Sequence, residues 1–198
     1  MARKVFFSFH YERDAWRAAN VRNCDTISDD DEYGVIDAAE WEEIESGGDT
    51  AIKKWIKEQL HHTSVTVVLI GAETASRDWV LYEIRESWKR GNAVLGLRVH
   101  GIKDQDRQTD TYGKNPLDKI KFADGTSMSL VCKTYDWCAD NGRDNLSDWV
   151  ETAYQERQDL DQELEEESKK IEVKNTAYTA AVASGPTIIS SPAKPWAE

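Results

Sequence analysis

Short apolar runs separated by polar stretches predict a set of buried strands. The clearest run covers residues 65–70, Val-Thr-Val-Val-Leu-Ile, and another begins almost at the first residue, over 4–9. An unbroken β-branched run is typical of a strand buried on both faces, as in a parallel sheet. Residues 93–99 form a third apolar run, and shorter strands are predicted over 34–37 and 130–135.

Between these runs the apolar residues recur every three or four positions, which predicts amphipathic helices. A helix over 11–23 places Trp16, Ala19 and Asn23 on one side. The core positions of three later helices are Ile52, Ile56 and Leu60, then Val80, Ile84 and Trp88, then Leu146, Trp149, Val150, Ala153 and Tyr154. Asp49 and Ser76 can cap the first two of these.

This alternation of strands and helices predicts an α/β fold with a doubly wound parallel sheet, a flavodoxin-like three-layer sandwich. We place the domain over residues 1–158, with a charged helical extension and an Ala/Ser/Pro-rich tail over 159–198. The extension is either solvated or a docking segment for an assembly partner. A polar insertion over 101–127 is long enough to be either functional or poorly ordered.

Composition narrows the choice of partners. The chain has 25 basic and 37 acidic residues and a net charge of −12, with no basic stripe, so no nucleic-acid partner is expected. Its apolar runs are too short for a signal peptide or a membrane span, which predicts a cytoplasmic protein with no membrane partner. The three cysteines form no CxxC pair and are expected to be free thiols.

Candidate chemistry gathers where the strands end. In an open α/β sheet ligands bind at the carboxyl ends of the strands, and residues 8–11, 37–48 and 77–83 should meet there. In the last stretch Glu83 shares a helix face with Trp79, four residues earlier. Alone, such a glutamate is an ordinary surface residue. The chain has no P-loop and no G-x-G-x-x-G motif, so ATP hydrolysis and hydride transfer lack support.

Two segments resemble Toll/interleukin-1 receptor (TIR) domains. Val5-Phe6-Phe7-Ser8-Phe9-His10 is similar to the opening TIR strand, and residues 76–84 are similar to the signature S-x-x-W-[CV]-x-x-E-[LI]. The strand T-S-V-T-V-V-L-I-G and the Asn-Pro-Leu segment at 115–117 add a resemblance to the TIR-like proteins of the bacterial Thoeris anti-phage system. The resemblance extends over about residues 4–155.

The resemblance implies a TIR-like enzyme that cleaves the nicotinamide–ribose bond of NAD, its substrate, with Glu83 as catalytic residue and neither a cofactor nor a metal. A cyclic or conjugated ADP-ribose product would activate a separate effector. It also implies self-association through TIR surfaces and a phage-derived trigger. The residues expected to contact the substrate are Phe6, Ser8, His10, Tyr11, Asp37, Trp41, Trp79 and Asn115.

This chemistry requires few residues. Nicotinamide leaves as a neutral molecule, so no general acid is needed, and one carboxylate can stabilise the oxocarbenium-like ribose. Two other functions stay open: plain hydrolysis that depletes NAD, and a non-catalytic adaptor. His10 can equally cap the first helix, and Trp41 can equally be a core residue. His61 and His62 point about 100° apart on a helix, so they predict no metal site.

Overall fold

A parallel sheet of five strands forms the centre of the molecule. The computed structural model describes residues 3–24, 32–33, 44 and 46–182, with side chains for 3–24, 44 and 46–167. The strands lie in the order β2-β1-β3-β4-β5, and all neighbours are parallel. Their bounds are β1 Val5–Ser8, β2 Glu32–Tyr33, β3 Val65–Ile70, β4 Ala93–Arg98 and β5 Thr134–Asp136.

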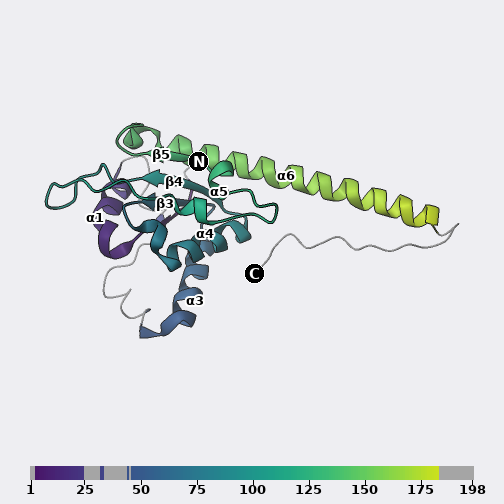
Figure 1. Cartoon of the computed structure of the whole chain (residues 1–198), viewed down its shortest axis with the longest axis horizontal. Helices are drawn as coiled ribbons and strands as arrows, with labels where there is room; N and C mark the ends of the chain where they lie inside the picture. The colour runs from purple at the N-terminus through teal and green to yellow at the C-terminus, as the bar shows by residue number, and fades with distance from the viewer. Residues whose placement is uncertain (1–2, 25–31, 34–43, 45, 183–198) are drawn as a thin grey trace.

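Helices cover both faces of the sheet (Figure 1). One layer contains α1 (Tyr11–Arg22) and the first turns of α6 (Gly142–Val182), and the other contains α3 (Gly48–His61) and α4 (Asp78–Arg90). Three short elements complete the described fold: η2 (Thr74–Ser76), η3 (Pro116–Lys119) and α5 (Met128–Val131). This three-layer arrangement confirms the predicted α/β doubly wound fold.

Strand alternation divides the core between the two layers. On β1, Phe7 packs toward α1 and α6, whereas Phe6 packs with Ile52, Ile56 and Leu60 of α3. On β3, Val65, Val67 and Leu69 face the layer that contains α1 and α6, whereas Val68 and Ile70 face α4. Phe6 and Phe7 therefore lie on opposite faces of the sheet, and the alternation turns every second residue of β1 toward the layer of α3 and α4.

Several local predictions were wrong. Ser76 does not cap α4, because its Oγ donates to the carbonyl oxygen of Glu73 within η2 and the helix begins only at Asp78. The apolar run over 130–135 begins as α5, where Met128 and Cys132 are buried four residues apart and Leu130 is 79% exposed. β5 starts later, at Thr134. The predicted strand over 34–37 lies outside the described residues, and β2 occupies 32–33.

The inward face of α1 also differs from the predicted pattern. Trp16 is 51% exposed, and the helix buries Asp14, Arg17, Ala18 and Val21 instead. Asp14 and Arg17 can be buried because Arg17 Nη1 pairs with Asp14 Oδ1 at 3.2 Å, which compensates both charges. In the sequence alone, two opposite charges three residues apart indicate a solvent-exposed helix face, so the burial of this pair could not be predicted.

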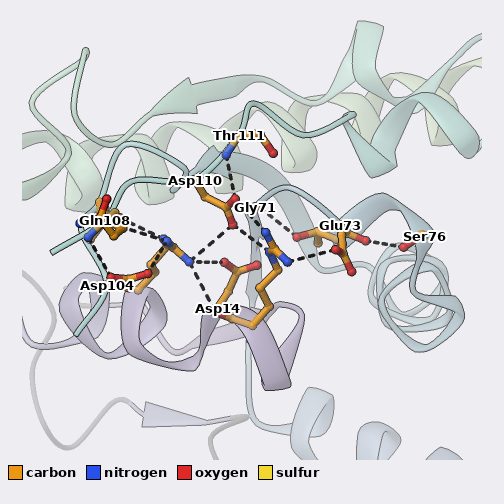
Figure 2. Close-up of polar contacts among 12 residues, drawn as sticks. Asp14, Gly71, Glu73, Ser76, Asp104, Gln108, Asp110 and Thr111 are labelled. Atoms are coloured by element: carbon orange, nitrogen blue, oxygen red, sulfur yellow. Dashed lines mark hydrogen bonds and ion pairs between the residues drawn. The ribbon is translucent and has the colours of Figure 1, made fainter. Parts of the chain in front are cut away.

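The insertion over 101–127 is packed against the carboxyl edge of the sheet. Gly113 passes so close to β3 that an added Cβ would lie 1.8 Å from the carbonyl oxygen of Gly71. Asp110 accepts two hydrogen bonds from Arg13 of α1, at 2.8 and 2.9 Å (Figure 2). Leu117 and Ile120 are buried in the α4 cluster. Both hydrogen bonds and apolar contacts therefore fix the insertion to the domain.

Helix α6 continues past the domain as a single rod (Figure 1). It packs on the sheet through Leu146 and Val150, and it reaches the end of α4, where the Arg157 guanidinium lies 3.8 Å from the Trp88 ring centroid. From 162 to 167 its side chains are exposed. The division at residue 158 stays a prediction, and one helix crosses it. Among the described helices, none combines the length and apolar character needed to span a membrane.

Candidate functional site

The candidate site lies at the carboxyl ends of β1 and β3. Strand order reverses there, because the chain runs outward from β1 to β2 and then returns to β3. Such a reversal leaves a crevice beyond the strand ends, where ligands of open α/β sheets bind. Ser8 ends β1, and Glu83 lies on α4, the helix that follows β3.

Ser8 and Glu83 make the central contact of this site. Ser8 Oγ donates a 2.5 Å hydrogen bond to Oε2 of Glu83. Ser8 is fully buried, and Glu83 is only 8% exposed. Ser8 is two residues after Phe6, so strand alternation turns it toward the layer that contains α4. Two residues from separate predicted stretches therefore meet at one buried point.

Burial controls the acidity of Glu83. Removal of the carboxyl from water raises its pKa to about 8, and the hydrogen bond from Ser8 acts in the opposite direction. In the free protein the group is therefore mostly protonated at neutral pH. A cation bound beside it would favour the carboxylate, since a neighbouring positive charge lowers the pKa of an acid.

Substitution of Ser8 by alanine is expected to raise the pKa of Glu83 further, by about one unit, because a hydrogen bond to the carboxylate is worth about 1.4 kcal/mol. The side-chain carboxyl carbon of Glu83 can be titrated by NMR in both proteins. Ser87→Ala is the matched control, because Ser87 is buried on the same helix and bonds to Thr66. An unchanged Glu83 titration in Ser8→Ala would contradict the assigned bond.

Aromatic side chains lie on the same side of the sheet as this pair. Trp79 and Tyr82 of α4 pack against the cluster of Phe6 and the α3 residues Ile52, Ile56 and Leu60. Their rings meet edge to face, with centroids 5.9 Å apart and planes at 87°. The structure thus brings Phe6, Ser8, Trp79 and Glu83 together between β1, α3 and α4.

The sequence that forms this site is similar to sequences of known proteins. Residues 6–104 match the family described as Thoeris protein ThsB, TIR-like domain. A protein of Bacillus cereus (strain MSX-D12), provisionally named a cyclic ADP-D-ribose synthase, ThsB1, is 34% identical, over 76% of this chain and 100% of that protein. The chain belongs to the ThsB family of TIR-like proteins. The match to the ThsB family covers β1 through β4, so it contains Ser8 and Glu83 and ends before Asn115.

In this ThsB-family chain, His10 stands at the start of α1. It is buried and occupies the N-cap position, but its side chain makes no capping bond; its Nε2 lies 3.4 Å from Glu12 Oε2. Nδ1 of His10 is buried without a hydrogen-bond partner. Tyr11 is the first residue of α1, and its ring centroid lies 6.2 Å from that of Phe9. Neither residue has a described hydrogen bond to Glu83, so their contact with substrate stays a prediction.

Asn115 has a local structural role. Its side chain accepts a hydrogen bond from the amide of Leu117 at the start of η3 and donates one of 3.0 Å to Oγ1 of Thr134 on β5. β5 is at the far edge of the sheet from β1. The structure therefore does not bring Asn115 to the Ser8–Glu83 pair through any described contact. Asp37 and Trp41 lie outside the described residues, and their roles stay predictions.

A polar network beside the site was missed by sequence reasoning (Figure 2). Arg17 Nε donates to the carbonyl oxygen of Ile102, and its Nη2 lies 3.5 Å from Asp104 Oδ2. Arg13 joins α1 to Asp110 and, at 3.0 Å, to Glu73 in the segment before α4. The Asp14 carboxyl faces Gly71, where an added Cβ would lie 2.2 Å from Oδ2. The network fixes α1, the end of β3 and the insertion to one another.

Metal ligands do not cluster in the part of the chain that the structure describes. No group of three or more His, Cys, Asp or Glu side chains there could hold a metal ion. All three cysteines are free thiols, with Cys24 and Cys132 buried and Cys138 exposed.

Proposed function

We propose that this chain cleaves the nicotinamide–ribose bond of NAD and converts the rest of the molecule into a cyclic or conjugated ADP-ribose signal in anti-phage defence. One observation carries the proposal: a buried glutamate, Glu83, is held by Ser8 at the topological switch point of the sheet. Membership of the ThsB family and the name of the Bacillus cereus relative support the same reaction class.

The charge of the substrate fits the electrostatics of Glu83. NAD carries a positive pyridinium on the anomeric carbon of its ribose, and this cation would shift the raised pKa of Glu83 downward and ionise it. As the carbon–nitrogen bond breaks, nicotinamide takes the bonding electrons and leaves neutral. Positive charge then moves to the ribose, where a desolvated carboxylate stabilises it more than water would.

The fate of the anomeric carbon depends on the nucleophile placed against it. A ring nitrogen of the adenine in the same molecule gives a cyclic product and releases one proton, whereas water gives ADP-ribose. Cyclisation is faster than hydrolysis only where the site excludes water and holds the adenine close to the anomeric carbon. Trp79 and Tyr82, which are only partly buried, supply stacking surface on the Glu83 side of the sheet, whereas Phe6 is 1% exposed and belongs to the core.

The principal product of wild-type protein with NAD is expected to be isobaric with cyclic ADP-ribose, or heavier by an acceptor. Chromatography with mass detection at early and late times, in extracts of phage-infected cells and with purified protein, measures it. Glu83→Gln protein is the control for contaminating activity. Free ADP-ribose as the sole product at all times would favour a plain hydrolase. Absence of nicotinamide release under every condition would favour an adaptor.

A further inference from the structure

An open basic groove runs along α3 and borders the aromatic side of the Ser8–Glu83 site at Tyr82, whose ring centroid lies 5.9 Å from Lys53 Nζ. Its volume is about 740 Å³. Four lysine or arginine side chains and two histidines line it, against one carboxylate: Lys53, Lys54, Lys57, Arg90, His61 and His62, with Glu58. We call this surface the α3 groove. It is a concentration of positive charge on a chain whose net charge is −12.

Three of these side chains form a stripe. Lys53, Lys57 and His61 follow one another at four-residue intervals, and all three are exposed. Nearby carboxylates compensate only part of the charge: Glu58 lies 3.7 Å from Lys54, and Glu86 lies 3.7 Å from Lys57. Positive charges four residues apart repel each other and destabilise a helix slightly. An acidic surface bound along the stripe would offset this repulsion.

The form of the groove favours a macromolecule over a small ligand. The side chains of Lys54 and Lys57 are 77% and 62% exposed, so a small anion there would remain in water and gain little. A helix that carries acidic residues at matching intervals can make several weak contacts at once.

The extension of α6 carries such a stripe. Asp159, Glu163 and Glu167 are exposed and also recur at four-residue intervals. Each interval corresponds to a rise of about 6 Å along a helix, so the acidic and basic stripes have equal spacing. Leu164 beside them is 56% exposed and adds an apolar contact.

The extension cannot reach the α3 groove of its own chain. Leu146 and Val150 fix the start of α6 to the sheet face opposite α3, and Arg157 fixes the next turns through bonds to the carbonyl oxygens of Trp88 and Asn92. The helix then continues straight and points away from α3 (Figure 1). A straight helix held at its base does not fold back.

We propose that the α6 extension of one copy of this chain docks along the α3 groove of a second copy, with Asp159, Glu163 and Glu167 against Lys53, Lys57 and His61. The two surfaces differ, so the contact is head to tail and can continue from copy to copy. The inference does not depend on the proposed activity, because association can be measured on protein that has no substrate.

Sedimentation velocity on the full chain over a range of concentrations tests this contact. Wild-type protein is expected to self-associate at about 0.05 M salt, and at least about tenfold more weakly near 1 M, where the screening length is about 3 Å. Lys53→Glu/Lys57→Glu and Glu163→Lys/Glu167→Lys are each expected to lose at least about tenfold in association constant. Lys103→Glu/Lys114→Glu, on the insertion, is the matched charge control and should associate like wild type.

Mixing the two charge-reversed proteins tests whether the α6 extension is the segment that docks in the α3 groove. An equimolar mixture should regain association, because each protein then finds an opposite charge on the other. A chain that carries all four reversals should also self-associate. A monomeric wild type, a mixture that stays monomeric, or loss of association in the groove variant alone would each overturn the docking of α6 in the α3 groove. Circular dichroism of each variant verifies that the helices are retained.

Discussion

Glu83→Gln protein is expected to release nicotinamide from NAD about a hundred- to a thousandfold more slowly than wild type. Glutamine keeps the shape of the side chain and can still accept the hydrogen bond from Ser8. It lacks the negative charge that, in the proposed reaction, stabilises the oxocarbenium-like ribose, and loss of one such electrostatic group costs about 10²–10³ in rate. Nicotinamide release measured under activating conditions gives the result directly.

The same variant is expected to be more stable than wild type at neutral and higher pH. Burial raises the pKa of Glu83 from 4.5 to about 8, so between these values the folded state binds more protons than the unfolded state. Wild-type stability therefore falls as pH rises through this window, by on the order of 3 kcal/mol at pH 7, and glutamine is free of this loss. Urea unfolding at several pH values measures the difference, which should vanish near pH 4.5.

Glu86→Gln is the control for both measurements. Glu86 lies almost one turn further along α4 and forms surface ion pairs with Lys57 and Lys89, at 3.7 and 3.4 Å. Its substitution should change stability by less than about 1 kcal/mol and leave nicotinamide release within a few-fold. Glu83→Gln protein with near wild-type release would remove Glu83 from the proposed reaction.

The strands and the site helix could be predicted because local patterns determine them. The β-branched run of β3 and the four-residue spacing of Val80, Ile84 and Trp88 are visible without any tertiary information. The resemblance to TIR domains singled out both Ser8 and Glu83. Their hydrogen bond joins residues 75 positions apart, so it follows only from the strand order, which no local pattern contains.

Burial of charged residues could not be predicted in the same way. Asp14 and Arg17 are close neighbours on α1, and a charged pair at that spacing is typical of a solvent-exposed helix face. Its burial depends on the insertion, whose carbonyl groups at Ile102 and Gln108 accept bonds from Arg17. The polar sequence of 101–127 gave no sign that its backbone supplies those acceptors. The exposure of Trp16 follows from the same cause, since the charged pair occupies the inward face.

Arg17→Met is expected to lower the free energy of unfolding by about 3–5 kcal/mol, because it leaves a buried carboxylate without its cation. Arg17 is 4% exposed, and it lies within 3.7 Å of Asp14 and Asp110 as well as of Asp104. Burial already raises the pKa of Asp14, and the positive charge of Arg17 opposes that rise. Without Arg17 the Asp14 carboxyl must either stay charged in a dry site or take up a proton.

The pH dependence of this loss of stability distinguishes an electrostatic role of Arg17 from a packing role. In Arg17→Met protein the pKa of Asp14 rises further above its unfolded value, so stability falls more steeply with rising pH than in wild type. The deficit should shrink toward acid pH, and Asp14→Leu/Arg17→Met should recover part of it, since no buried charge then remains. Arg13→Met is the comparison: the Arg13 side chain is 40% exposed, and its substitution should lower the free energy of unfolding by about 1–2 kcal/mol, less than that of Arg17. An Arg17→Met deficit that is constant with pH and unrelieved in the double variant would assign the role of Arg17 to packing alone.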